Sequence, residues 1–328
     1  MSHSRLSLAL DDTALALPPE GRIAVFAPGM DADLSSLPKD RVHILQGFYP
    51  ASQYWASLGF QTGVTPDGDY SAAVVFLPRA KALARAMVCD ASRAAGGGLV
   101  LVDGQKTDGI DSLSKALRAK VTMDGVFSKA HGKLLWFSGG DFSDWAAKDT
   151  TLEGGYITRP GVFSADGVDK GSAALVAALP AVLKGRVADF GAGWGYLARE
   201  VLKRDDVTVL DLVEADHSAL DCARENISDP RAAFIWGDAT RYETRAPYDV
   251  VISNPPFHTG RAGDPALGRA FIRSAASVLK PAGHLWIVAN RHLPYEATLN
   301  DFFREVTEVG GTSGFKVFHA AKPRRNPR

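Results

Sequence analysis

Four consecutive residues, Asn254, Pro255, Pro256 and Phe257, carry the clearest chemistry in the chain. They follow the apolar run 250–252, and proline neither donates to a β-ladder nor varies its φ, so we expect a strand that stops in a rigid loop. Such a loop can aim the side-chain oxygen of Asn254 and the carbonyl of Pro255 at one small donor, with the Phe257 ring as a face for a planar base. The exocyclic NH2 group of a nucleobase fits these features. The alternative is a Pro-Pro turn beside a buried phenylalanine.

A second group of candidate residues lies upstream, where positions 187–195 read V-A-D-F-G-A-G-W-G. An apolar strand with an acidic residue near its end leads into three glycines spaced two apart. Glycine adopts positive φ and lets the backbone approach a ligand closely, so the pattern predicts a strand-to-helix turn that binds a cofactor. The residues assigned to this turn are Asp189, Gly191, Ala192, Gly193 and Gly195. A tight βα turn without a ligand is the alternative, whereas the dehydrogenase fingerprint G-x-G-x-x-G is not met.

Two carboxylates follow the next two predicted strands. Residues 207–214 form an apolar run closed by Glu214, where doubly wound folds grip ribose hydroxyls. Asp238 follows the short run 233–236 and can accept from an adenine amino group or cap the next turn. With the glycine turn and Asn254, these residues occupy four successive strand ends in the order and spacing of a class I S-adenosylmethionine methyltransferase, an α/β fold.

The segment 160–172, just before the first of these strands, is rich in Asp and Gly. We expect it to close over the methionine part of the cofactor, with Asp169, Gly171 and Ser172 as binding residues. The composition of residues 173–183 predicts a helix, for which Ser172 is a candidate N-cap.

Composition sets the outer limits of the interpretation. At 328 residues and 46% hydrophobic, the chain is long enough for two domains with separate cores. Lys plus Arg and Asp plus Glu number 37 each, so the net charge is zero and any nucleic-acid binding must be local. The basic cluster at 322–328 could contact phosphates, or it could be a solvated terminus.

The same composition argues against membrane, metal and disulfide chemistry. No run approaches the ~18 apolar residues of a membrane helix, and positions 1–10 lack the features of a signal peptide. Cys89 and Cys222 both fall in helix-like patterns, which supports neither a metal site nor a disulfide. These features predict a globular cytoplasmic protein.

The two halves of the chain parallel each other. Positions 22–29 match 186–193 in their apolar register, and 73–78 match 250–255. A helix, a glycine turn, a strand and a final hairpin follow in the same order in both halves, which indicates duplication of a whole domain rather than a solenoid. The alternative is the similarity that any two α/β sheets share.

The first copy has lost the candidate chemistry. It lacks two of the three turn glycines, has no asparagine before Pro78, and carries Arg79 where a second proline would stand. A polar stretch containing glycine at 145–156 marks the boundary. We therefore expect a degenerate methyltransferase-like domain over 1–150, used for substrate docking or shielding, and a catalytic domain over 151–328.

Five motifs together resemble the bacterial ribosomal RNA guanine-N2 methyltransferases of the RsmC/RlmG type, and the resemblance covers nearly the whole chain. They are G-V-F-S-x-D-G-x-D-x-G-S (161–172), D-F-G-A-G-W-G (189–195), S-N-P-P-F-H (253–258), V-A-N-x-x-L-P-Y (288–295) and F-K-V-F (315–318). In that family two Rossmann-like class I methyltransferase domains stand in tandem, and only the second binds cofactor. The chain departs from the usual glycine motif at Trp194.

The resemblance implies methyl transfer from S-adenosyl-L-methionine, with S-adenosyl-L-homocysteine as product, to the N2 group of a guanosine in 16S ribosomal RNA. The partner would be ribosomal RNA or the assembled small subunit, with Phe163 and His258 contacting the RNA. The guanine amino lone pair is delocalised, so two acceptors at Asn254 and Pro255 would favour a pyramidal nitrogen without a strong base. For His258, a positioning or RNA-contact role is favoured over general-base catalysis.

Other functions remain open on the sequence alone. N-P-P-[FY] serves any planar NH2 group, so a large-subunit guanine, adenine N6 or a protein glutamine amide is an alternative substrate. A non-catalytic RNA-binding protein of ribosome assembly is a second alternative, against which the intact Asp189, Glu214 and Asn254 argue. A small-molecule methyltransferase is a third, for which the large first domain would be superfluous.

Overall fold

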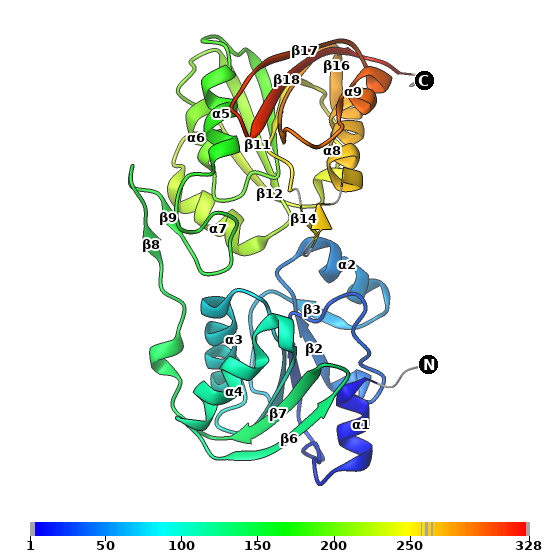
Figure 1. Cartoon of the computed structure of the whole chain (residues 1–328), viewed down its shortest axis with the longest axis vertical. Helices are drawn as coiled ribbons and strands as arrows, with labels where there is room; N and C mark the ends of the chain where they lie inside the picture. Colours follow the sequence, from blue (N-terminus) through cyan, green and yellow to red (C-terminus); the bar gives the residue numbers. More distant parts are fainter. Residues whose placement is uncertain (1–3, 257, 260–261, 264, 326–328) are drawn as a thin grey trace. The chain divides into compact units, whose positions relative to one another are not determined.

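The computed structural model describes residues 4–256, 258–259, 262–263 and 265–325 of the chain. The chain divides into two compact units, Met1–Asp149 and Thr150–Arg328 (Figure 1). Each unit is built on a seven-stranded sheet. Two tandem Rossmann-like domains are therefore present, as the sequence predicts.

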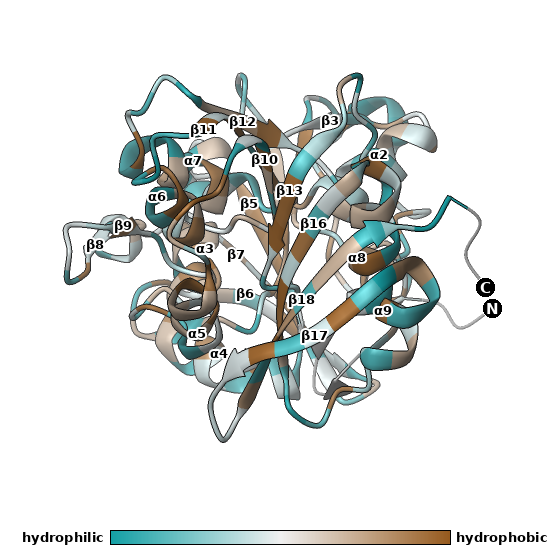
Figure 2. Cartoon of the chain, turned by 90° about the horizontal axis from the view of Figure 1, so that it is seen from above, coloured by the Kyte–Doolittle hydropathy of each residue, from teal (hydrophilic) through white to brown (hydrophobic). Residues whose placement is uncertain are grey.

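The sheet of the second unit has the order β12-β11-β10-β13-β16-β18-β17. The strands from β12 to β16 pair in parallel, whereas β18 is antiparallel to both β16 and β17. Parallel strands covered on both faces are apolar throughout, and β10 and β13 have the hydrophobic colours of such strands in Figure 2. The strand bounds are β10 Gly185–Phe190, β11 Val207–Glu214, β12 Ala232–Trp236, β13 Tyr248–Ser253, β16 Leu279–Asn290, β17 Phe303–Gly311 and β18 Phe315–Pro323.

Helices cover both faces of this sheet. On one face Phe271 and Leu299 pack with Phe190 and Val251, and on the other Leu175 and Leu220 pack with strand residues that include Ile252. This two-sided covering produces the doubly wound architecture. The helices are α5 Lys170–Ala178, α6 Tyr196–Val201, α7 His217–Asn226, α8 Pro265–Val278 and α9 Glu296–Phe302, with the 3-10 turn η4 at Ala239–Arg241.

Helix α5 differs from the expected helix over 173–183. Asp169 is the N-cap, because its side chain accepts from the backbone N–H of Ser172, so the assignment of Ser172 as the cap was wrong. The helix ends at Ala178, and Leu179 is extended. Pro180 explains this end, since a residue that precedes proline is pushed out of the helical region.

The first unit repeats the sheet order strand for strand as β3-β2-β1-β4-β5-β7-β6. Its strands are β1 Ile23–Phe26, β2 Val42–Leu45, β3 Gln61–Gly63, β4 Ala72–Phe76, β5 Leu99–Gln105, β6 Met123–Lys129 and β7 Gly132–Ser138. Its longer helices are α1 Arg5–Asp12, α2 Tyr49–Ser57, α3 Lys81–Ala94 and α4 Ile110–Arg118. The short strands β8 Thr150–Thr151 and β9 Ile157–Thr158 begin the second unit.

The duplication extends to the helix before the first strand of each sheet. Helix α1 packs on β6 and β7, as α5 packs on β17 and β18. The capping is also repeated, because Ser4 Oγ accepts from Ser7 N as Asp169 accepts from Ser172 N. The sequence comparison missed this pair of helices because their residues share little beyond the cap.

The strand pairing shows that the alignment of positions 73–78 with 250–255 was wrong by one residue. Phe26 is opposite Val75, whereas Phe190 is opposite Ser253. Phe76, rather than Leu77, therefore stands in the place of Asn254, and Pro78 stands in the place of the second proline. A uniform apolar run can be aligned in several ways from the sequence, because no residue in it marks the register. The hydrogen-bond pairing of the strands fixes that register. The first copy still has no asparagine at this position.

Candidate active site

The candidate residues of the second unit gather at one edge of its sheet. Strands β10, β11, β12 and β13 are parallel neighbours, so the residues that follow them emerge at the same edge. In open α/β sheets ligands bind outside these carboxyl ends. A cleft at this edge is lined by Phe163, Ser164, Asp169, Ser172, Gly191, Ala192, Gly193, Trp194, Tyr196, Leu197 and Asn254.

The glycine turn has the backbone shape that its sequence predicts. Gly191, Gly193 and Gly195 have φ of +74°, +54° and +92°, a region that favours glycine. A Cβ on Gly195 would lie 2.8 Å from Ile227 Cδ1, so this glycine permits close packing of the turn. A Cβ on Gly193 would meet nothing within 4 Å. The backbone at Gly193 therefore faces open space that a ligand could approach.

Two carboxyl groups lie beneath this turn. Glu214 Oε2 accepts from Gly193 N at 2.7 Å and Oε1 accepts from Asp216 N at 2.8 Å, while burial raises the pKa of Glu214. Asp189 is fully buried, and neither of its oxygens has a hydrogen-bond partner among the described residues. Burial, reinforced by the charge of Glu214, raises the pKa of Asp189 to about 8. At neutral pH the neutral form of Asp189 is thus favoured.

Asn254 is held by the amino end of α5. Its Nδ2 donates to Asp169 Oδ2 and to Ser172 Oγ, each at 2.8 Å. Its Oδ1 is buried and accepts no hydrogen bond from the described part of the chain. A buried carbonyl oxygen without a donor is costly, at about 1–3 kcal/mol. The arrangement leaves one acceptor available beside the cleft.

Trp194 joins the glycine turn to the segment around Phe163. The indole is buried among aromatic rings that include Tyr156, with centroids 5.0 Å apart, and its Nε1 donates to Phe163 O at 2.9 Å. Phe163 itself is 54% exposed and lines the cleft. Trp194 thereby fixes the backbone that presents Phe163. The sequence analysis did not assign this role to Trp194, although it identified this residue as the departure from the usual glycine motif.

Comparison with known proteins identifies methyltransferases that are similar to most of the chain. The methyltransferase small domain family matches residues 153–319. The ribosomal RNA small subunit methyltransferase C of Shewanella loihica is 33% identical, over 76% of each chain. That of Hahella chejuensis is 28% identical, over 94% of this chain and 93% of its own.

A solved structure extends the match to the fold. The 16S rRNA N2 methyltransferase (RsmC) of T. thermophilus, in complex with AdoMet and guanosine, superposes with a TM-score of 0.78 at 25% identity. The match covers 94% of this chain and 90% of that one.

The chain belongs to the methyltransferase small domain family, as a relative of the ribosomal RNA small subunit methyltransferase C proteins.

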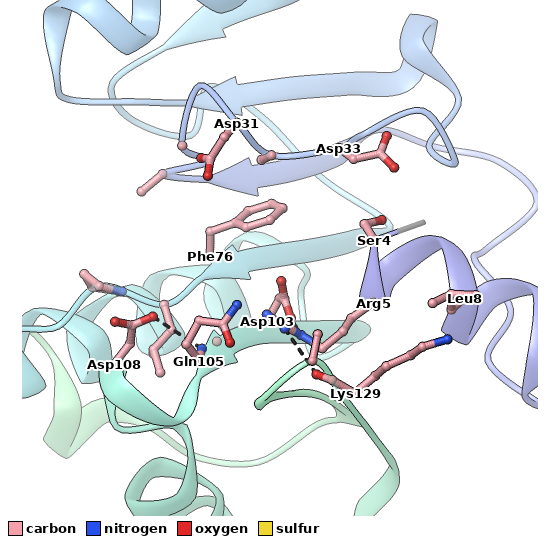
Figure 3. A pocket seen from close by; sticks show the side chains of 17 residues that line it. Ser4, Arg5, Leu8, Asp31, Asp33, Phe76, Asp103, Gln105, Asp108 and Lys129 are labelled. Carbon is pink, nitrogen blue, oxygen red and sulfur yellow. Dashed lines mark hydrogen bonds and ion pairs between the residues drawn. The ribbon is translucent and has the colours of Figure 1, made fainter. Parts of the chain in front are cut away.

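The first unit differs from the second at the edge of the sheet where its parallel strands end. There Ala27 takes the place of Gly191 and keeps a positive φ, at +49°. Arg5 and Asp103 form an ion pair at 2.6 Å, with exposed side-chain fractions of 9% and 14%. Figure 3 shows Phe76 between this pair and the loop that bears Asp31, within a cavity of about 590 Å³. The edge retains the shape of a binding site but has no amide in the position of Asn254.

The remaining predicted residues are less closely joined to the cleft. Asp238 Oδ1 accepts from Thr240 N at 2.8 Å and from Thr240 Oγ1 at 2.6 Å, so this side chain caps the turn η4. Gly171 lies against the ring of Phe315, which a Cβ would meet at 3.0 Å. Phe257 is outside the described residues. His258 belongs by its backbone to the short hairpin β14 His258–Thr259 and β15 Ala262–Gly263.

The sequence predictions also concern metal-binding clusters, cysteines and membrane-spanning helices. The described part of the chain contains no cluster of three or more His, Cys, Asp or Glu side chains able to hold a metal ion. Cys89 in α3 and Cys222 in α7 are both buried. None of the helices described is long and apolar enough to cross a bilayer.

Proposed function

We propose that this chain transfers the methyl group of S-adenosylmethionine to the N2 amino group of a guanosine in 16S ribosomal RNA. The observation that carries the proposal is the buried Oδ1 of Asn254, an acceptor with no donor among the described residues, at the cofactor edge of a methyltransferase fold. An NH2 group supplies the missing donor. The relatives named for small-subunit RNA, and the similar structure that holds AdoMet and guanosine, support the same substrate.

The residues at this edge fit S-adenosylmethionine. The open space at Gly193 gives the backbone access to a ligand, and the Glu214 carboxylate at the end of β11 stands where ribose hydroxyls are held in doubly wound folds. Asp169 and Ser172 line the cleft next to Asn254 and would border the methionine part. When bound, this cofactor supplies an electrophilic methyl group on sulfur. The chain's own residues must then place an amino nitrogen in line with that group.

Asn254 would orient and activate the amino group. Its Oδ1 accepts one N–H, and the Pro255 carbonyl, in the rigid turn after β13, is the second acceptor. Two such hydrogen bonds draw the N–H bonds out of the ring plane, so the nitrogen lone pair becomes available for attack. Fixed positioning and fixed dipoles of this kind are each worth several kcal/mol, on the order of 3 to 10 in favourable cases.

No strong base is needed for this reaction. The nitrogen becomes cationic as it gains the methyl group, and it then releases a proton readily to water. We assign His258 and Phe163 to contacts with the RNA, and Phe257 to stacking on the base. The target guanosine must leave its stack to reach the cleft, so a loop or flipped nucleotide is expected.

The first unit would serve docking or shielding rather than catalysis. It keeps the sheet and the helix cap of the second unit but replaces the amide with Phe76 and fills part of its edge with the Arg5–Asp103 pair. We infer that the substrate is the assembled small subunit or its RNA, and that the reaction takes place in the cytoplasm, where these occur.

Nucleoside analysis tests the proposal. Small subunits, large subunits and stripped RNA that lack the modification are incubated with the protein and labelled S-adenosylmethionine, then digested to nucleosides. We expect N2-methylguanosine, and we expect it from the small subunit or 16S RNA. Label on adenine N6, on a glutamine or on large-subunit RNA alone would replace this function with one of the alternatives.

A further inference from the structure

The second unit has another unusual surface, at the sheet edge where the parallel strands begin. A cavity of about 600 Å³ lies there, and its lining includes Asp249 from the start of β13 together with His284, Trp286 and His319. A neighbouring hollow is lined by Arg304, Arg324 and Arg325. Adjacent residues near the start of β16 line the two hollows, Pro281 in one and Ala282 in the other. We use the name distal groove for these two hollows and for six of the side chains that line them, namely His284, Trp286, His319, Arg304, Arg324 and Arg325.

Three rings form a continuous stack in the distal groove. The centroids of Trp286 and His319 are 4.4 Å apart at an interplanar angle of 26°, and those of His319 and His284 are 5.1 Å apart at 22°. His284 Nδ1 and His319 Nε2 also lie 3.0 Å apart, so the two imidazoles share a hydrogen bond. All three side chains are only partly buried. A pre-stacked aromatic row beside a cavity is a surface on which a nucleobase can stack.

The charges around this row favour a polyanion. Arg304 and Arg325 are exposed, and no ion pair engages Arg304, Arg324 or Arg325 among the described residues. The two nearby carboxylates are already neutralised, because Asp249 is bound by Lys280 at 2.8 Å and Glu305 by Lys322. The excess positive charge is local, since the whole chain has a net charge of zero. In Figure 2 the chain leaves β18 toward the C-terminus in hydrophilic colours.

The distal groove is too far from Asn254 to hold the reacting base. Strand β13 runs from Tyr248 to Ser253, so Asp249 is its second residue and Asn254 directly follows it. At about 3.3 Å per residue, they are separated by about 17 Å. A ligand in the groove must therefore be a different part of the substrate from the methylated nucleotide.

We propose that the distal groove binds a single-stranded segment of ribosomal RNA that flanks the target, with phosphates at the arginines and a base on the ring stack. This inference rests on the proposed function, because it assumes an RNA substrate. It assigns the second unit an RNA contact of its own, in addition to any contact made by the first unit. Affinity for RNA should then depend on residues that touch neither cofactor nor target base.

The test compares charge removal inside and outside the groove, in the full chain. The variant Arg304→Ala/Arg325→Ala removes two groove charges, and the control Lys203→Ala/Arg224→Ala removes two exposed charges near β11 and β12, at the other end of the sheet. Binding of stripped 16S RNA is measured over a range of salt. We expect the groove variant to bind at least about fivefold more weakly and its salt slope to fall by about 0.7 for each phosphate that is no longer neutralised. The control should stay within twofold of wild type, as should S-adenosylmethionine affinity in both.

A second pair of variants tests stacking. Trp286→Leu keeps an apolar side chain but removes the ring, whereas Trp286→Phe retains a ring. We expect about a tenfold loss of RNA affinity for the leucine variant and near recovery for phenylalanine. If Trp286→Leu also lost cofactor affinity, it would be misfolded, and the arginine pair would decide the question.

The outcomes separate this inference from the proposed function. A wild-type protein that methylates 16S RNA, with groove and control variants equal in RNA affinity and salt slope, would overturn the distal groove alone. A loss seen only on assembled subunits and not on stripped RNA would assign the groove to a ribosomal protein, which also overturns it. Failure of the wild type to methylate any ribosomal RNA would instead remove the proposed function.

Discussion

At the scale of single residues, the nitrogen and the oxygen of the Asn254 amide have different surroundings. Its NH2 group donates to Asp169 and Ser172, and its oxygen accepts no hydrogen bond from the described residues. The reverse orientation would set the amide oxygen against the Asp169 carboxylate, where both atoms are acceptors. The helix cap of α5 therefore determines the orientation of the amide. Under the proposed function, Asp169 therefore both caps α5 and orients the acceptor for the amino group.

Replacing Asn254 with alanine should separate catalysis from cofactor binding. The substitution removes one acceptor for the amino group but leaves the glycine turn and Glu214 in place. We expect kcat to fall at least 100-fold, about 3 kcal/mol of transition-state stabilisation, while S-adenosylmethionine affinity changes only a few fold. The control is Asn300→Ala, since Asn300 is exposed on α9 and its side chain donates to Glu296 O. Activity of the Asn254 variant within tenfold of wild type would show that this residue is not the acceptor.

Asp189 should make the stability of the cofactor-free protein depend on pH. Burial and Glu214 raise its pKa in the folded state from 3.8 to about 8. Between these values the unfolded chain releases a proton that the folded chain keeps, so the free energy of unfolding falls as pH rises, by at most about 1.4 kcal/mol per pH unit. Asp189→Asn is neutral in both states and should flatten this slope.

Urea unfolding at pH 5, 6, 7 and 8 measures the effect of Asp189. We expect the stability advantage of the asparagine variant over wild type to grow with pH and to level off above about pH 8. The same slope in the two proteins would mean that Asp189 is ionised in the folded state.

At the scale of elements, the sequence predicts what periodicity and turn chemistry encode. The strand expected over 207–214 is observed with the same bounds, and the glycine turn has the positive φ that its spacing implies. The register between the two halves and the end of α5 were not predictable in the same way. The first depends on hydrogen-bond pairing along uniform apolar runs. The second depends on Pro180, which forces Leu179 out of the helical region although the composition of 173–183 is helical. The roles of the site residues stay predictions, because they depend on a bound cofactor and RNA.

The residue Ala27 tests whether the first unit keeps a strained remnant of the glycine turn. Its φ of +49° costs an alanine about 1–2 kcal/mol, whereas glycine tolerates it. We expect Ala27→Gly to raise the free energy of unfolding of the first unit by up to about 1 kcal/mol, after the greater flexibility of unfolded glycine is deducted. Ala130, which also has positive φ, at +48°, provides a matched comparison. Destabilisation by Ala27→Gly would show that the turn is not strained. Cofactor binding should remain absent from this unit in either case, since Asp31 stands where the turn of the second unit has Gly195.

At the scale of the whole molecule, the two copies of the fold differ in the candidate functional residues that they retain. Both units retain the sheet order and the capped helix before the first strand, but only the second retains the three glycines and the amide. A unit that keeps the fold but has lost the candidate catalytic residues is suited to a role as a binding surface. With a net charge of zero, the chain cannot rely on general attraction to RNA, so recognition must come from local contacts and shape. The distal groove provides one such contact, and the first unit would provide another.

Separating the two units tests this division. We expect residues 151–328 alone to bind S-adenosylmethionine with one site per chain and residues 1–150 alone to bind none, as measured by calorimetry. The isolated second unit should nevertheless methylate its RNA poorly, because it keeps the distal groove but lacks the surface of the first unit. Rates for the second unit and the full chain are compared on small subunits, large subunits and stripped RNA at one salt concentration, since phosphate contacts make affinity strongly dependent on salt. Calorimetric binding by the second unit shows that it is folded, so a low rate then reflects docking. Equal rates on every substrate would exclude a docking role and leave shielding or assistance in folding as the function of the first unit.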